Sequence, residues 1–213
     1  MNLRDILPKE EMYRLFDGGI TFEEYTFKDI DSIKEMKAHI LFGLTMYVWN
    51  RIVRFNLVEV DPSAVTDYIE RKDPDIYRKA SSILGADIIK DLYYVKGQIE
   101  GASNDSMTVS ELLAARIYPN NLHLADISFI LPEKTPSKGD YNDPDLQHEY
   151  LLYKLIDNAV RYGKSKGCNY LMLTLKSSHY VKIFSKCGFM LEDPLTETKS
   201  VELGMGIPML KLI

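Results

Sequence analysis

The spacing of apolar residues changes along the chain and predicts where strands give way to helices. In the segment 19–27, β-branched and aromatic residues partly alternate with polar ones, which predicts a strand. In the segment 29–40 the apolar residues recur every three to four positions, the spacing of an amphipathic helix. The pattern stays mostly helical from 41 to 90, so the first half of the chain is rich in helices.

The middle of the chain predicts a hairpin and a short helix. The stretch "DLYYVKGQIEGA" (91–102) reads as two short strands joined by a turn at Lys96-Gly97. The stretch "SELLAARI" that follows has a helical pattern, and Asn120-Asn121 terminates it.

The last third alternates strands and helices. It predicts a buried central strand at 122–131, a long helix at 145–166, a buried strand at 169–175, a serine-capped helix at 177–187, and short strands at 189–191 and 207–213. This order is typical of an α/β domain with a mixed, twisted sheet flanked by helices. We expect the strands 122–131 and 169–175 to pair. We also expect the functional site at the C-terminal end of the first, where the long helix begins.

Composition narrows the class of protein. The chain has 213 residues, 46% of them apolar, and no linker of domain-separating length, so we expect one domain over 1–213. A net charge of −5 without a basic stripe argues against nucleic acid as a partner. No apolar run is long enough to cross a membrane and the N-terminus is charged, which favours a cytoplasmic protein. The two cysteines and four histidines show no ligand spacing, so no metal is expected.

Three motifs of the second half stand out: "ILPEK" (130–134) at a strand end, "GCNYLML" (167–173) between a helix and a strand, and "IFSKCGF" (183–189) at the end of the last helix. They resemble, in this order, the end of the fourth strand, the helix exit with the fifth strand, and the last signature of the GCN5-related N-acetyltransferases (GNAT), which use acetyl-CoA. "TFEEYTFKDIDSIKEM" resembles the opening strand and helix. The resemblance implies a GNAT-like fold with an enlarged helical first half, an N-terminal half at 20–102 and an acyl-CoA-binding half at 122–213.

The resemblance also implies where the co-substrate, acetyl-CoA or another acyl-CoA, would lie. The backbone of Ile130 and Leu131 would hold its thioester arm, and the start of the long helix, with Gln147, His148 and Tyr150, its pyrophosphate. In the family's register Tyr150 and Leu152 stand where two glycines let phosphate approach backbone amides. The pyrophosphate-binding loop is therefore degenerate.

The catalytic residues expected from the resemblance also depart from the pattern. Phe184 replaces a tyrosine that protonates the leaving thiolate, so Tyr180, one helical turn earlier, is the candidate acid. On the strand 122–131, Asp126 is the candidate base, because burial among apolar neighbours would raise its pKa. His123, three residues away, also occurs where members of the family often have the base, but it should point to the opposite face, so at most one of the two faces the cleft. The alternatives, that Tyr180 packs against the sheet and that Asp126 is a capped or solvent-facing carboxylate, stay open.

The resemblance and these departures from it imply two candidate functions. The first is an acyl-CoA-dependent N-acyltransferase acting on a small-molecule or peptide amine. The second is a non-catalytic binding module of the same fold with its cofactor cradle filled in. We expect the helical block 41–90 to shape the acceptor side of the cleft, or its apolar surface around Trp49 to form a homodimer face.

Overall fold

The computed structural model describes residues 1–100, 106–130, 144–192 and 206–213, and for 144–147 the backbone alone. Its helices of four or more residues are α1 (Lys9–Leu15), α2 (Ile30–Arg54), η3 (Pro62–Val65), α3 (Thr66–Glu70), α4 (Ile76–Leu84), α5 (Pro144–Ser165) and α6 (Val181–Lys186). Three short 3₁₀ turns are η1 (Leu3–Asp5), η2 (Phe27–Asp29) and η4 (Ser178–Tyr180). The strands are β1 (Ile20–Thr26), β2 (Ile89–Glu100), β3 (Ser106–Ile117), β4 (Asn121–Phe129), β5 (Tyr170–Leu175), β6 (Met190–Leu191) and β7 (Ile207–Leu212).

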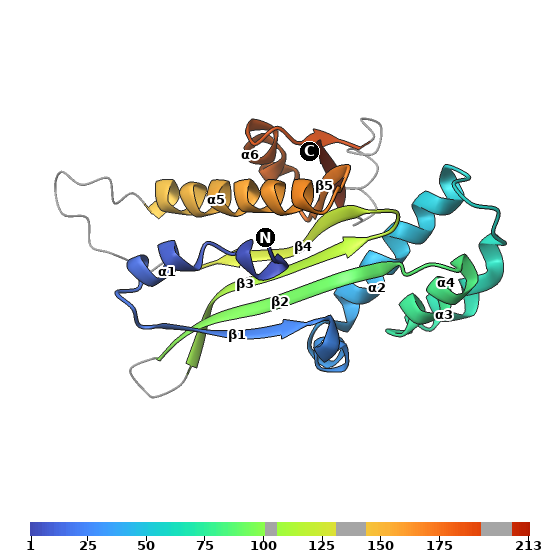
Figure 1. Ribbon diagram of the computed structural model, residues 1–213, viewed down its shortest axis with the longest axis horizontal. Coiled ribbons are helices and arrows are strands. Elements are labelled where there is room, and N and C mark those ends of the chain that lie inside the picture. The colour runs from blue at the N-terminus through green and yellow to red at the C-terminus, as the bar shows by residue number, and fades with distance from the viewer. Residues whose placement is uncertain (101–105, 131–143, 193–205) are drawn as a thin grey trace.

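The seven strands form one mixed sheet in the order β1-β2-β3-β4-β5-β7-β6 (Figure 1). Neighbours are antiparallel except β4 and β5, which are parallel and joined through α5. The predicted α/β class, the mixed sheet and the pairing of these two strands are therefore confirmed. The sheet runs through both proposed halves of the chain without a break.

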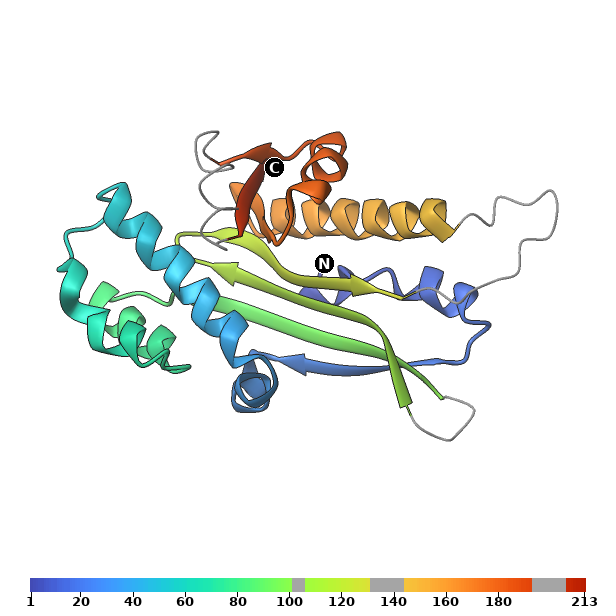
Figure 2. The ribbon, with the colours of Figure 1, turned by 180° about the vertical axis from the view of Figure 1, so that it is seen from behind.

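Helices cover both faces of the sheet, and each face has its own apolar core. On one face, α1 and α5 pack over the strands, and Leu151, Leu155 and Ala159 form the buried stripe that the sequence predicted for α5 (Figure 1). On the other face α2 crosses the strands, as Figure 2 shows from behind. Ile33 and Leu41 of α2 are fully buried there.

The stretch "SELLAARI" is part of strand β3 and not a helix, so that prediction was wrong. Its apolar residues Leu112 and Ala114 face the α5 side, whereas Leu113 and Ala115 face the α2 side. A central strand covered on both faces is apolar at most positions, and such a run cannot be distinguished from a buried helix by its spacing.

The predicted turn at Lys96-Gly97 was also wrong, because β2 runs unbroken from Ile89 to Glu100. Gly97 pairs with Phe22 of β1 and Ser110 of β3. A Cβ atom on Gly97 would lie 2.4 Å from Ser110 Oγ and 3.0 Å from Ile20 Cδ1. Glycine is present here because neighbouring side chains fill the space, and not because the chain turns.

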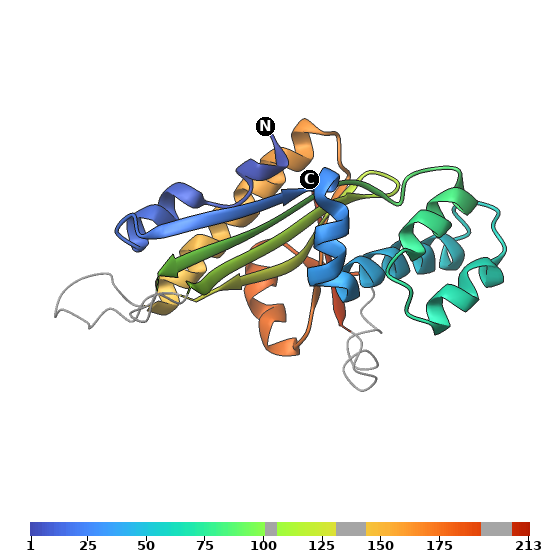
Figure 3. The same ribbon diagram turned by 90° about the horizontal axis from the view of Figure 1, so that it is seen from below.

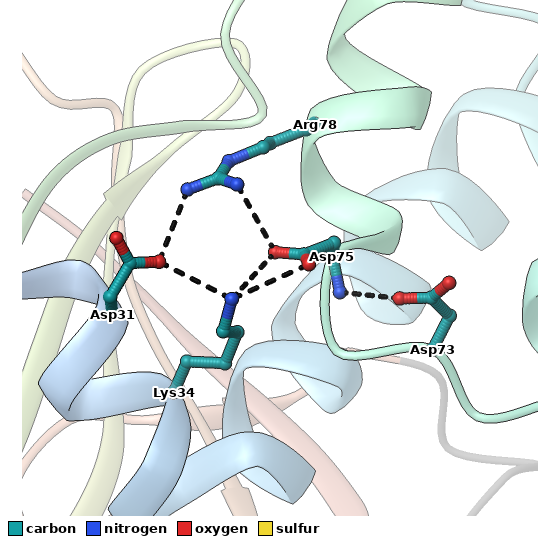
Figure 4. A network of polar contacts seen from close by, with 5 residues as sticks. All are labelled: Asp31, Lys34, Asp73, Asp75 and Arg78. Atoms are coloured by element: carbon teal, nitrogen blue, oxygen red, sulfur yellow. Dashed lines mark hydrogen bonds and ion pairs between the residues drawn. The ribbon is translucent and has the colours of Figure 1, made fainter.

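The helices α3 and α4 extend beyond the end of the sheet and pack beside α2 (Figure 3). Trp49 of α2 is 2% exposed and lies in the core with residues of α4, so it contributes no exposed surface itself. Phe55 and Leu57, directly after α2, are each 49% exposed, and the homodimer face stays a prediction. An exposed ion-pair network ties the start of α2 to α4 (Figure 4). In it Asp31 and Asp75 each form ion pairs with both Lys34 and Arg78, with nitrogen–oxygen distances of 3.2–3.5 Å.

We predict that Gly97→Ala destabilises the protein by about 1–3 kcal/mol, the usual cost of overpacking a filled core. Gly43 is the matched control. It lies in α2 with nothing within 4 Å of an added Cβ, so Gly43→Ala should be neutral or stabilise by up to about 1 kcal/mol. Urea unfolding of both variants measures the difference, and equal effects would contradict this explanation of Gly97.

Candidate functional site

The sheet opens between β4 and β5. These strands pair only over Leu122–Leu124 and Leu171–Leu173. Beyond that point β4 continues along β3 as far as Phe129, and β5 continues along β7. The opening thus lies at the C-terminal end of β4, where the sequence predicted the site.

A β-bulge coincides with the opening. Leu113 of β3 pairs with Asp126 and the next residue, Ala114, pairs with Leu124, so Ala125 is an extra residue in β4. A bulge bends its strand and changes the direction of the side chains that follow it. The bulge therefore accounts both for the departure of β4 and for the side-chain directions beyond it.

The bulge places His123 and Asp126 on the same face, contrary to the prediction that they point to opposite faces. Their partners in β3 are Ala115 and Leu113, two residues apart and hence on one face of the sheet. Asp126 contacts Lys37 and His123 contacts Tyr47, both on α2. In an uninterrupted strand Asp126 would face away from His123. The extra residue Ala125 turns Asp126 to the face of His123.

Lys37 lies at the centre of the site. Its Nζ is 2.8 Å from Glu111 Oε2 on β3 and 2.9 Å from Asp126 Oδ2 on β4. It also lies 5.3 Å from the centre of the Tyr94 ring on β2. The Lys37 side chain is 13% exposed, and its backbone (φ −134°, ψ 34°) interrupts the helical conformation of α2. We call Lys37, Tyr94, Glu111 and Asp126 the Lys37 centre.

The charges of the Lys37 centre stabilise one another. Burial acts against the charged form of Lys37, but hydrogen bonds to Glu111 and Asp126 outweigh it, so the pKa of Lys37 lies above its ordinary value. Burial would raise the pKa of Glu111, yet hydrogen bonds from Lys37 and from the Tyr94 hydroxyl, at 2.8 Å, outweigh it and lower that pKa. Lys37 is accordingly an ammonium and Glu111 a carboxylate at neutral pH.

Asp126 is therefore not the isolated, apolar-buried carboxylate that the sequence suggested. Its side chain is 22% exposed and ion-paired with Lys37. The expected surroundings were wrong because Lys37 comes from a helix 89 positions earlier in the chain. The position of Asp126 beside the opening is as expected, and its role as a base stays a prediction.

A second polar group lies further along α2. The Tyr47 hydroxyl donates to Glu192 Oε2 at 2.7 Å and accepts from Arg51 at 3.1 Å, and Arg51 also forms an ion pair with Glu192. Burial raises the pKa of Tyr47 to about 12. The Tyr47 ring meets the edge of His123 at 5.3 Å. His123 is 4% exposed, and its Nδ1 has no hydrogen-bond partner among the described residues.

The residues predicted to bind the co-substrate lie after the end of β4 and on α5. The Ile130 amide donates to Val109 O at 2.7 Å, and its side chain is half exposed. His148 Nε2 lies 3.2 Å from Phe129 O. Tyr150 is 49% exposed on α5, with Lys154 Nζ 5.6 Å from its ring centre. Leu131 and the Gln147 side chain lie outside the described residues.

The candidate acid Tyr180 lies at the end of η4, directly before α6. It is 48% exposed, so it does not pack as a core residue, and its ring contacts His179 edge-on. Phe184, one turn later, is buried and packs against Phe189. Tyr180 and Phe184 therefore differ in burial although they are four residues apart.

Three residues of the Lys37 centre were missed by the sequence analysis. Lys37 and Glu111 are charged residues within helix and strand patterns, with no motif around them. The one signal for Glu111 is a carboxylate inside the run "SELLAARI", and the helical spacing of that run hides it. Tyr94 lies in the first strand of the expected hairpin, where the sequence gives it no role.

Two surface cavities lie away from the Lys37 centre. One of about 530 Å³ lies between the N-terminal segment and α5, and its lining includes Arg4, Lys9, Glu11 and Lys154. The other, about 310 Å³, lies beside Tyr77 at the junction of η2, α4 and β2. Among the described residues no His, Cys, Asp and Glu side chains group as metal ligands, and none of the described helices has the length and apolarity to span a membrane.

Comparison with known proteins finds similarity in solved structures only. An acetyltransferase of the GNAT family from Staphylococcus aureus shares 14% identity over 91% of this chain and 98% of its own, with a TM-score of 0.36. Ard1 from Thermoplasma volcanium shares 10% identity over 92% and 98%, with a TM-score of 0.37. A streptothricin acetyltransferase from Bacillus anthracis, described as putative and solved with acetyl coenzyme A, shares 16% over 59% and 63%, with a TM-score of 0.34.

The aligned region spans less than two thirds of the Bacillus anthracis protein. No family model and no curated protein matches the chain. TM-scores below 0.4 mean that the superposed backbones agree only in part, so the function has to be argued from the side chains of this chain.

We predict that His123 makes the protein less stable in mild acid. Burial lowers the pKa of His123 to about 4, whereas an unfolded histidine titrates near 6.5. Between these values the unfolded chain binds a proton that the folded chain does not, so stability falls as pH decreases from about 6.5 to 4. The shift corresponds to a loss of up to roughly 3 kcal/mol.

Denaturant unfolding at pH 7 and pH 4.5 measures this loss. His123→Phe replaces the ring with one that does not titrate and should show a smaller decrease in unfolding free energy over the same interval. An equal decrease in both proteins would mean that other groups account for the acid sensitivity.

Proposed function

We propose that this protein transfers an acyl group from an acyl-CoA thioester to an amine, at the opening between β4 and β5. The observation that carries the proposal is the parting of these strands at the Ala125 bulge, with the carboxylate of Asp126 immediately beyond it. An extended thioester arm needs unpaired backbone groups to bind along, and an amine acceptor needs a nearby base.

The backbone of β4 supports the first requirement. Alternate residues of a strand direct their N–H and C=O groups to opposite neighbours. Because the Ile130 amide binds Val109 of β3, the backbone groups of Phe129 and Ile127 point toward the side that β5 has left. Phe129 O already accepts from His148, so the Ile127 groups and the Phe129 amide are the ones we assign to the thioester arm. By the same alternation the carbonyl of Ile130 points toward β3, so Ile130 is not among the groups we assign to the arm, and Leu131 lies outside the described residues.

The start of α5 is less well suited to a pyrophosphate. The helix runs from Pro144 through the positions of Gln147, Tyr150 and Leu152, so no glycine loop exposes its amides at those positions. Tyr150 is exposed, whereas Leu152 packs against the core. We therefore expect acyl-CoA to bind chiefly through its arm and more weakly than in a protein with the glycine loop.

The reaction would use Asp126 and Tyr180. Asp126 takes a proton from the acceptor ammonium, the free amine attacks the thioester carbonyl, and the carbon–nitrogen bond forms. The tetrahedral intermediate loses its second nitrogen-bound proton to water and collapses with cleavage of the carbon–sulfur bond. Tyr180 donates its phenolic proton to the departing thiolate, and its phenolate then takes a proton from water.

The second candidate function is a binding module without chemistry. The continuous helix at the degenerate loop favours it, because a filled cradle removes the anchor for the nucleotide part of coenzyme A. Thermal melting separates the two functions at the binding step. A ligand that binds only the folded protein raises the melting midpoint, so acetyl-CoA in excess should raise it by about 2–5 °C if the arm binds at the opening.

A titration without any rise, together with no coenzyme A release in the presence of simple amines, would favour the binding module. Coenzyme A without its acyl group is the control ligand. It should give a rise of similar size, because the arm and not the acyl group makes the β4 contacts.

We predict that Tyr180→Phe lowers the turnover number of acyl transfer about 10²-fold and leaves the affinity for acyl-CoA nearly unchanged. A positioned acid acts in the transition state and contributes little to ground-state binding. Steady-state coenzyme A release with any amine that the wild type acylates measures the effect. Tyr153→Phe is the control. It removes the hydroxyl of another exposed tyrosine, which lies on α5, and should retain full activity.

A further inference from the structure

The surroundings of the Lys37 ammonium would also suit the ammonium group of a bound ligand. Its ammonium lies between two carboxylates on neighbouring strands, 2.8 and 2.9 Å away, and 5.3 Å from the Tyr94 ring centre. Paired carboxylates and an aromatic ring are the groups that recognise a primary alkylammonium ion. An acceptor amine presented to Asp126 would need the same place.

The position of Lys37 in the fold supports this reading. Asp126 is the first residue beyond the Ala125 bulge, so the ammonium lies beside the opening assigned to the thioester arm. Lys37 reaches it from the one residue of α2 whose backbone departs from the helical conformation. The segment of α2 before it is held by the Lys34 network with Asp31 and Asp75 (Figure 4).

The charge state of the Lys37 centre also bears on the reaction. A carboxylate hydrogen-bonded to the protein's own ammonium has a bond to lose before it can accept a proton from another amine. If Lys37 leaves, Asp126 and Glu111 lose the ammonium that both contact, and Glu111 keeps only the longer-range attraction of Lys96, so a second cation is drawn into the vacated place. The exchange conserves charge and hydrogen bonds.

We propose that Lys37 is an internal stand-in for the acceptor: its ammonium occupies an alkylammonium-binding site made by Glu111, Asp126 and Tyr94, and a primary amine substrate must displace it. This inference rests on the proposed function for the identity of the acceptor site. It adds the acceptor class, a primary alkylamine, and an autoinhibitory contact that limits its binding.

The first test uses binding and requires no acyl transfer. Lys37→Ala opens the site, and n-butylammonium chloride is the probe. The melting midpoint of Lys37→Ala should rise by about 2–5 °C at saturating probe, compared with an equal concentration of sodium chloride. The wild type should not respond. Tetramethylammonium, which has no N–H group to donate to a carboxylate, should give a smaller rise.

Two further variants locate the effect. Lys96 is the matched control, because its Nζ also lies over the Tyr94 ring, at 5.6 Å, but it donates to Met36 Sδ and not to Glu111 or Asp126. Lys96→Ala should not respond to the probe, and Lys37→Ala combined with Asp126→Asn should lose most of the response. If Lys37→Ala does not fold, Lys37→Ser serves in the same series.

The proposal is overturned if neither Lys37 variant gains stability from n-butylammonium, or if the wild type and Lys96→Ala gain as much. A kinetic measurement gives an independent readout where the wild type acylates an alkylamine. Lys37→Ala should then lower the KM for the amine about tenfold or more. A purely structural Lys37 would instead lower kcat or raise KM, and that result would also refute the stand-in.

The experiments distinguish failure of the transferase activity from failure of the alkylammonium site. No coenzyme A release from any protein in the series, with a butylammonium response in Lys37→Ala, would refute the transferase and leave the alkylammonium site. Acyl transfer by the wild type, with no response to the probe and no decrease in KM, would leave the transferase and refute the stand-in.

Discussion

The single extra residue at Ala125 is the constraint on which the rest of the site depends. A parallel pair such as β4 and β5 would normally remain hydrogen-bonded along its shared length, because an unpaired backbone group inside a protein is costly. The bulge bends β4 away after three paired residues, and it does so where Lys37 and Tyr47 of α2 contact the side chains of Asp126 and His123. The opening and the polar centre beside it therefore have one cause.

The same residue decides which side chains meet. With an uninterrupted strand, Asp126 would face α5 and the apolar core around Leu124, where an unpaired carboxylate would be strongly unfavourable. With the bulge it faces α2 and meets Lys37. The Asp126 carboxylate can therefore lie within a mostly apolar strand, because the bulge turns its side chain to the face where Lys37 is its counter-ion.

Features set by local conformational preferences could be predicted from the sequence, whereas features set by the folded sheet could not. The order of elements in the last third, the cap residue Ser177 and the helix-ending Gly167 and Gly188 were predictable, since each depends on local conformational preferences: both glycines have positive φ, at 64° and 84°. Strand β3 was not, because its two-sided burial depends on which helices cover it. The bulge leaves no signature in residue type, and the Lys37 centre joins four elements that only the folded sheet brings together.

The two polar groups on α2 differ in a way that bears on their roles. Around Tyr47, burial keeps the hydroxyl protonated and the Arg51–Glu192 ion pair, with side chains 23% and 11% exposed, closes the group on itself. It fastens α2 to the end of β6 and has no charge left to offer a ligand. In the Lys37 centre two carboxylates share one contacting ammonium, Lys96 acts on Glu111 only at longer range, and the centre lies next to the opening. A group whose charges are paired and enclosed stabilises the fold, whereas two carboxylates that share one ammonium at an open edge are suited to exchange that cation. This difference is why the acceptor site is assigned to the Lys37 centre and not to the Tyr47 group.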